Sequence, residues 1–149
     1  RLKMLVGEGG HVMGPTALFA AAAIAANLAW PSVFRMGTGR AGLVIGIVLL
    51  VVGVPLWITS VVQILVNVPK KKLITTGPFA LMLHPLYGCV ALLVIPGCGL
   101  VLDTWVGFAI GAVLYLFSRI YSPREEKLLT TFFPKEYPAY RAKVLLPWL

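Results

Sequence analysis

The chain has 149 residues, of which 59% are hydrophobic and 12% are charged, against about 25% charged residues in typical soluble domains. This composition excludes an intrinsically disordered chain and argues against a water-soluble globule. Since about 20 apolar residues cross a bilayer once, four crossings nearly exhaust the chain, and we expect a single domain over residues 1–149. Cys89 and Cys98 lie in apolar stretches and are expected to be packing residues.

Four uncharged apolar runs predict four transmembrane helices and therefore an all-α polytopic membrane protein. The runs lack the alternating pattern of a membrane β-barrel. The first helix is expected over Met13–Trp30, and it is expected to remain in the protein because no small-residue cleavage site follows it. The second helix is expected over Gly42–Val66, interrupted by Pro55. These two helices make up the first part of the domain, residues 1–66.

The third and fourth helices are predicted to form a hairpin within residues 67–149. The third is expected over Pro85–Val101, with its far end weakened by Pro96. A turn at Asp103, expected to be a helix N-cap, leads to the fourth helix over Thr104–Tyr121. Two pairs of small residues four apart predict close helix packing: Gly42 with Gly46, and Gly107 with Gly111. We expect this packing within one bundle. A homo-oligomer formed through these glycine-rich faces is the alternative.

The tail after the fourth helix predicts a short amphipathic helical segment. Apolar residues recur there at helical spacing until Pro134, namely Leu128, Leu129, Phe132 and Phe133. A second short turn follows, with Tyr137, Tyr140 and Val144 on one face. The tail is therefore expected to be either an interfacial anchor or a lid over a site on the cytoplasmic face.

The basic residues are divided unequally between the two ends of the predicted bundle. With four crossings, both termini and the loop over residues 67–83 share one side, which carries every Lys and Arg except Arg35 and Arg40. The positive-inside rule then places both termini and this loop in the cytoplasm. The net charge of +8 is explained by contact with the lipid bilayer, and no nucleic-acid partner is expected.

Two groups of ionisable residues are candidates for chemistry. His84 lies at the start of the third helix. Because Pro85 suits the first helical position, His84 is expected near the N-cap. The free N–H groups at a helix N-terminus favour an anionic ligand group. Arg124, Glu125 and Glu126 follow the fourth helix and should lie at the same end. A capping histidine and a solvated charged face are the simpler interpretations of the two groups.

Several motifs occur in a fixed order between Leu73 and Pro147, about half of the chain. They are Leu73-Ile74-Thr75-Thr76-Gly77-Pro78-Phe79, then His84-Pro85-Leu86-Tyr87-Gly88, a helical hairpin, Glu125-Glu126-Lys127-Leu128-Leu129, Phe132-Phe133, Glu136-Tyr137, Tyr140 and Pro147. This ordered set resembles the isoprenylcysteine carboxyl methyltransferase family and its phospholipid-methyltransferase-like relatives.

The resemblance implies an integral membrane methyltransferase that uses S-adenosylmethionine, releases S-adenosylhomocysteine, needs no metal and acts on a lipophilic or prenylated acceptor. It implies a cofactor site on the cytoplasmic side formed by Lys71, Lys72, Leu73, Ile74, Phe79, His84, Pro85, Leu86, Tyr87 and Glu125. The family usually has arginine at the position of Leu83 and tyrosine at that of Phe79. The role of the arginine is therefore expected to pass to Arg119, Arg124 or a lysine of the 70–72 run, and Glu125, Arg124 and Arg119 are the expected catalytic residues.

Two alternatives belong to other classes. One is a small binding or transport bundle in which His84 and the glutamates serve ions or protons. The other is an NADPH-dependent enzyme similar to sterol reductases, which share a His-Pro-x-Tyr pattern but have longer chains. The sequence leaves the methyl acceptor open between a carboxylate, which needs no general base, and an amine, for which Glu125 or Glu126 would remove a proton.

Overall fold

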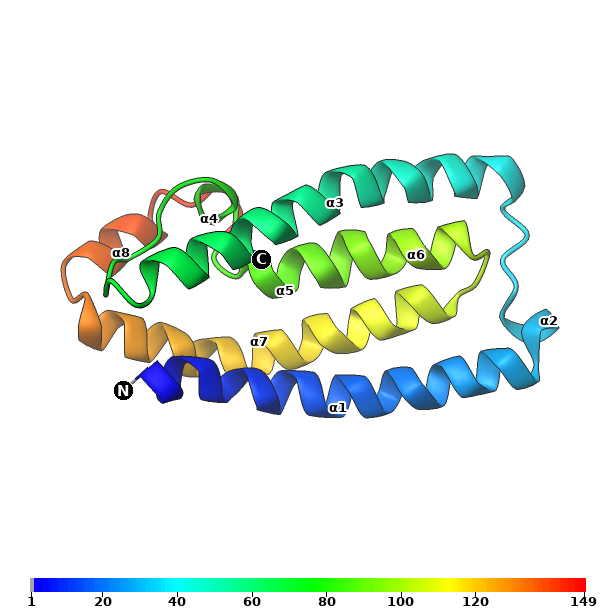
Figure 1. Cartoon of the computed structure of the whole chain (residues 1–149), viewed down its shortest axis with the longest axis horizontal. Coiled ribbons are helices and arrows are strands. Elements are labelled where there is room, and N and C mark those ends of the chain that lie inside the picture. Colours follow the sequence, from blue (N-terminus) through cyan, green and yellow to red (C-terminus); the bar gives the residue numbers. More distant parts are fainter. Residues whose placement is uncertain (1) are drawn as a thin grey trace.

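A computed structural model describes the chain from Leu2 to Leu149, with side chains from Gly10 onward. Over these residues the chain is helical and forms no strand, which confirms the all-α prediction. The elements are α1 (Leu2–Ala29), α2 (Pro31–Phe34), α3 (Gly39–Asn67), α4 (Pro78–Leu81), α5 (Pro85–Cys89), a π-helical turn (Val90–Val94), α6 (Ile95–Val101), α7 (Val106–Phe132) and α8 (Glu136–Arg141). Figure 1 shows the long helices α1, α3 and α7 side by side with the segment formed by α5 and α6.

Three helices are long and apolar enough to cross a membrane: α1 over Gly10–Ala29, α3 and α7. Their exposed side chains are mostly large and apolar, as expected for surfaces that face lipid. The third predicted helix, Pro85–Val101, also forms, but it is shorter, with 17 residues. The three long apolar helices indicate a membrane protein, and a membrane crossing by Pro85–Val101 stays a prediction.

Helix α7 corrects the prediction of a separate amphipathic helix after Tyr121. It continues through Pro123 to Phe132, so Glu125 lies within a long helix and not behind one. The hydroxyls of Ser118 and Ser122 donate to backbone oxygens of the preceding turn, at 2.7 and 2.6 Å. Hydroxyl groups of this kind help membrane helices to tolerate a proline without ending. In the same way α1 begins at Leu2, well before Met13, and contains Pro15.

Glycines bring α6 into backbone contact with both of its neighbours. A Cβ atom at Gly46 of α3 would lie 2.8 Å from the carbonyl oxygen of Gly97, and one at Gly107 of α7 would lie 2.6 Å from the Cα atom of Gly99. Gly111 faces the carbonyl oxygen of Ala91 in the same way. These glycines pack within one bundle; Gly42, the other member of the first predicted pair, faces the side chain of Thr38.

The segment from α5 to α6 contains a local change of helical pitch. A π-helical turn over Val90–Val94 comes directly before Pro96, which has no N–H group to donate to the preceding turn. The irregularity predicted near Pro96 therefore occurs one turn earlier, and the helix nevertheless continues to Val101.

The connection from α6 to α7 closes one end of the bundle. Asp103 has a left-handed backbone (φ 53°), and its carboxylate accepts hydrogen bonds from Arg35 and from the backbone N–H and hydroxyl of Thr38, at 3.1 to 3.2 Å. The N-cap of α7 is Trp105, without a side-chain cap. Asp103 was thus wrongly predicted as an N-cap; it joins the α6–α7 turn to the segment between α2 and α3.

Candidate functional site

The other end of the bundle holds a cavity of about 400 Å³, which is within the range for small-molecule sites. It lies between the last turn of α3, the start of α5, α7 and α8. Most of its wall is apolar, with a few polar groups among the lining residues: Ile64, Leu65, Val68, Leu73, Ile74, Phe79, Leu83, His84, Pro85, Leu86, Tyr87, Glu125, Leu129, Tyr137 and Tyr140. We refer to it as the α5 cavity.

His84 is held in the wall of the α5 cavity by the start of α5 and by the C-terminal segment. It occupies the N-cap of α5, followed by Pro85 in the first turn, as predicted. Its backbone N–H donates to the carbonyl oxygen of Leu149 at 3.0 Å, and the N–H of Leu146 donates to the oxygen of Leu81 at 2.8 Å. The C-terminal segment therefore fixes the position of the loop that carries the histidine.

A cluster of charged side chains surrounds the imidazole. Its Nδ1 lies 3.3 Å from Oε2 of Glu125, and its Nε2 lies 3.7 Å from Oε1 of Glu126. The guanidinium of Arg141 lies 2.8 Å from the other oxygen of Glu126. The side chains of His84 and Glu126 are only 9% and 14% exposed, so these charges interact with little screening by water.

The two glutamates decide the protonation of His84. Burial is the largest single influence and lowers the pKa of the imidazole, but the hydrogen bonds and negative charges of Glu125 and Glu126 together outweigh it. The pKa of His84 is therefore raised above the ordinary value of 6.5, which favours the imidazolium at neutral pH. A protonated His84 has two N–H donors, and the one on Nε2 has no hydrogen-bond partner among the described residues.

Two tyrosines of α8 complete the wall opposite His84. Tyr137 is 2% exposed and packs in a core with Leu83, Tyr140 and Val144. Its hydroxyl is buried and has no hydrogen-bond partner within the described part of the chain. Burial, followed by the charge of Glu126, raises the pKa of Tyr137 to about 12, so the phenol stays a donor. Buried polar groups are almost always hydrogen-bonded, so the hydroxyl of Tyr137 marks a position where a ligand would provide an acceptor.

Most of the predicted cofactor residues meet in this one cavity. They are Leu73, Ile74, Phe79, His84, Pro85, Leu86, Tyr87 and Glu125. Lys71 and Lys72 do not line it: both are exposed in the turn after α3, where Lys71 has a left-handed backbone (φ 54°).

The predicted arginines lie elsewhere. Arg119 and Arg124 are exposed on α7 and do not line the α5 cavity, and the guanidinium of Arg124 lies 5.3 Å above the ring of Tyr121. The guanidinium that contacts the cluster belongs to Arg141, which we did not predict. Leu83 is buried against the tyrosines of α8, so the side chain that differs from the family pattern serves packing here.

The sequence did not indicate the lining residues from α3, which are Ile64, Leu65 and Val68. They continue an apolar run without any distinguishing pattern. The tyrosines of α8 and Leu129 did carry a signal, since both were expected on apolar helical faces of the tail. Over the described residues, no group of three His, Cys, Asp or Glu side chains is arranged to hold a metal ion. Comparisons with protein families, with curated proteins and with solved structures gave no match for this chain.

Proposed function

We propose that the protein is an integral membrane methyltransferase that binds S-adenosylmethionine in the α5 cavity and methylates a lipid-borne acceptor. The observation that carries the proposal is the meeting of His84 and Glu125, from distant parts of the chain, in the wall of a cavity of about 400 Å³. The motif residues from Leu73 to Tyr87 line the same cavity.

The chemistry of the lining residues fits this cofactor. The hydroxyl of Tyr137 is a buried donor without a hydrogen-bond partner among the described residues, and the imidazolium of His84, which the two glutamates favour, adds positive charge; both suit the methionyl carboxylate. Glu125 offers a carboxylate for the ammonium or the ribose hydroxyls, and Phe79 and Tyr87 offer aromatic surface for the adenine and the sulfonium.

The residues around the cavity would mainly bind, orient and exclude water. When bound, S-adenosylmethionine supplies a methyl group that is already activated, so positioning an acceptor in line can provide most of the rate enhancement. The apolar side chains of Leu65 and Leu129 line the cavity and would disfavour water beside the bound ligand. Because the charge of Glu125 is already paired with His84, the arrangement favours an acceptor that needs no deprotonation, which is a carboxylate.

Titration calorimetry of the purified chain with S-adenosylmethionine and, separately, with NADPH tests the cofactor. Binding of S-adenosylmethionine but not NADPH is expected, followed by transfer of a labelled methyl group to an apolar thioether carboxylate in preference to a lipid amine. Binding of NADPH alone would replace the proposal with the reductase. Binding of neither would leave the proton-handling bundle, in which the cluster of His84 with Glu125 and Glu126 is the functional element.

The proposal includes four crossings with both termini and the α5 cavity on the cytoplasmic side. Figure 1 supports it in two ways. The helices α1, α3 and α7 and the α5–α6 segment alternate in direction along the chain, and α8 lies at the same end as the connection from α3 to α5. Labelling of Thr38→Cys and Lys71→Cys, each introduced after replacement of Cys89 and Cys98, should find the two positions on opposite sides of the membrane. Labelling from the same side would contradict this topology.

A further inference from the structure

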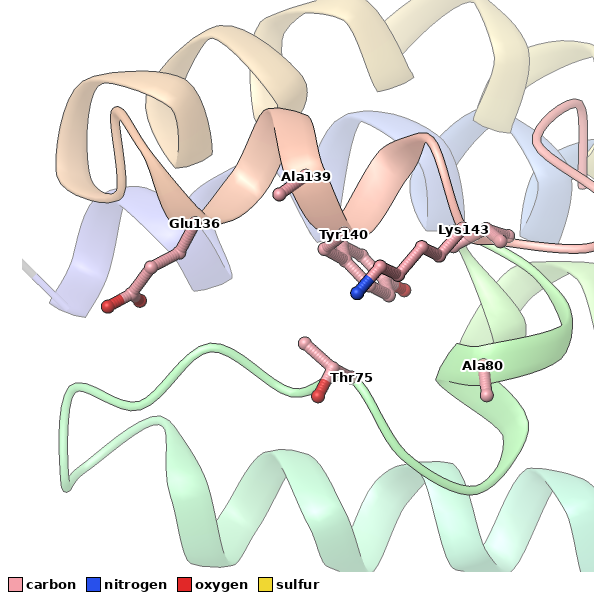
Figure 2. A pocket seen from close by; sticks show the side chains of 7 residues that line it. Thr75, Ala80, Glu136, Ala139, Tyr140 and Lys143 are labelled. Atoms are coloured by element: carbon pink, nitrogen blue, oxygen red, sulfur yellow. The ribbon is translucent and has the colours of Figure 1, made fainter.

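A second cavity, of about 320 Å³, lies between α8 and the segment that leads into α4 (Figure 2). Its lining residues are Thr75, Ala80, Glu136, Ala139, Tyr140, Lys143 and Val144. Tyr140 lines this cavity and the α5 cavity, and its hydroxyl donates to the carbonyl oxygen of Phe79 at 2.5 Å. The ring is therefore fixed as a wall between two separate cavities. We call the second one the α8 cleft.

Two opposite charges border the α8 cleft. Glu136 begins α8, and Lys143 follows seven residues later, which is about two helical turns and brings both to one side of the segment. Figure 2 shows Lys143 extending along the gap toward Tyr140 and Glu136 at the other edge of the gap, with Thr75 on the opposite wall. Within the described part of the chain, neither charge forms an ion pair and the hydroxyl of Thr75 has no hydrogen bond.

This arrangement contrasts with the charges of the α5 cavity, where Glu126 is paired with Arg141. An acid and a base that face a common cavity without pairing are complementary to a ligand that carries both charges. A lysine and a hydroxyl suit a phosphate, and a carboxylate beside an aromatic ring suits a substituted ammonium group. Ala139, Val144 and the ring of Tyr140 supply the apolar surface that such a group also needs.

Size and position limit the ligand further. Its volume of about 320 Å³ is within the range for small-molecule sites and has room for a lipid headgroup. The cleft lies at the end of the bundle that carries the exposed lysines Lys70–Lys72 and Lys135. Basic segments next to membrane helices attract the phosphate groups of lipids.

We propose that the α8 cleft binds a zwitterion made of a phosphate and a substituted ammonium group, as in phosphocholine. Lys143 and Thr75 would hold the phosphate, and Glu136 and the ring of Tyr140 the ammonium group. The ligand is either a headgroup of the surrounding bilayer or its soluble equivalent. This site is independent of methyl transfer, because the quaternary nitrogen of phosphocholine cannot accept a further methyl group.

The test uses the full chain in nanodiscs of phosphatidylglycerol, which contain no zwitterionic lipid. Binding of soluble phosphocholine is measured by ³¹P saturation-transfer NMR and calorimetry, against glycerol phosphate as an anion alone and choline as a cation alone. We expect phosphocholine to bind at least tenfold more tightly than either. In the Lys143→Gln variant, phosphocholine should bind no more tightly than choline. In the Glu136→Gln variant, phosphocholine should bind no more tightly than glycerol phosphate. Lys135→Gln, an exposed neighbour outside the cleft, is the matched control and should change nothing.

A second measurement identifies the source of the ligand. Native mass spectrometry of the chain from nanodiscs of mixed phosphatidylglycerol and phosphatidylcholine should show phosphatidylcholine enriched on the wild type and not on the Glu136→Gln, Lys143→Gln double variant. Enrichment indicates a bilayer headgroup, and binding of soluble phosphocholine without enrichment indicates a free ligand. If phosphocholine binds no better than its two halves and phosphatidylcholine is not enriched, the proposal is overturned. Calorimetry with S-adenosylmethionine on the same samples reports on the α5 cavity separately.

Discussion

The two ends of the bundle treat their polar groups in opposite ways. At the closed end, the carboxylate of Asp103 accepts hydrogen bonds from Arg35 and Thr38, and Gly99 packs against Gly107 backbone to backbone. At the cavity end, the buried hydroxyl of Tyr137 has no hydrogen-bond partner among the described residues, and Nε2 of His84 has only the ion-pair contact with Glu126 at 3.7 Å. The closed end therefore satisfies its polar groups within the protein, whereas the buried donor of Tyr137 at the other end points to a ligand.

The most severe change at the cavity end should be Tyr137→Ala. The side chain is 2% exposed and lies in the core formed with Leu83, Tyr140 and Val144. Removing a buried aromatic ring leaves a cavity and should lower the free energy of unfolding by about 3–5 kcal/mol, measured by denaturation in detergent micelles. An unchanged stability would show that α8 does not pack as described.

Tyr137→Phe is the matched variant that separates packing from binding. It removes only a hydroxyl that has no hydrogen-bond partner among the described residues, so stability should be kept or slightly raised. Binding of S-adenosylmethionine should nevertheless weaken, because the ligand loses a buried hydrogen bond. If Tyr137→Phe destabilises the chain and leaves binding intact, the hydroxyl serves the fold, and the contrast between the two ends disappears.

The closed end should respond to Gly107→Ala. The added Cβ would lie 2.6 Å from the Cα of Gly99 and 2.8 Å from the carbonyl oxygen of Ile95, both backbone atoms. Overpacking of this kind should cost about 1–3 kcal/mol of stability, while S-adenosylmethionine binding to the folded protein stays unchanged. Gly14→Ala in α1, where nothing lies within 4 Å, is the control and should keep the stability of the wild type.

His84→Ala and Glu125→Ala test whether both residues contact one ligand. Each should weaken S-adenosylmethionine binding by about 1–3 kcal/mol in calorimetry, the usual consequence of losing a hydrogen bond with a charged partner. Because the two side chains lie 3.3 Å apart, the double variant should lose less than the sum of the single losses. Unchanged binding in both single variants would remove the α5 cavity as the cofactor site.

The raised pKa of His84 predicts a dependence of stability on pH. A basic group whose pKa is higher in the folded chain stabilises it fully below the ordinary value of 6.5, and this contribution is lost as the pH rises through the folded value. Wild-type stability should therefore fall above pH 6.5 more steeply than that of His84→Gln. If the stability of the wild type and that of His84→Gln depended on pH in the same way, the pairing of His84 with the two glutamates would be contradicted.

The smallest effect is expected for Asp103→Asn at the closed end. Hydrogen bonding from the backbone N–H of Thr38 and from Arg35 lowers the pKa of Asp103, so its stabilising effect is present at neutral pH and is lost as the pH falls through the lowered value. The pair with Arg35 is exposed, so the thermal midpoint should drop only slightly, and ligand binding should not change. A loss of binding would show that the two ends are coupled.

The helical architecture could be predicted because apolar runs in this chain have no other stable form in a membrane. The boundaries could not, because Pro15 and Pro123 are signals for helix ends in water and are tolerated here within α1 and α7. The role of Asp103 also depended on a contact with Arg35, far away in the chain, that no local pattern announces.

The candidate site could be predicted in part. His84 was singled out because an ionisable residue at the mouth of a membrane helix is costly, and Glu125 because of the family resemblance; the structure brings the two together. Arg141 was missed because its contact with Glu126 depends on the reversal of the chain between α7 and α8. Arg119 and Arg124 lie on an exposed face of α7. Their spacing in the sequence alone did not determine which face of the helix they occupy.

The short segment Pro85–Val101 also has a consequence for the bilayer. At 1.5 Å for each residue its 17 residues span about 25 Å, less than the roughly 30 Å of a typical hydrocarbon core. Helix α3, with 29 residues, reaches about 43 Å. In the four-crossing topology that we propose, such a hydrophobic mismatch would thin the membrane locally or draw the helix start below the headgroups. Since His84 is at that start, bilayer thickness would then change the depth of the α5 cavity and the access to it.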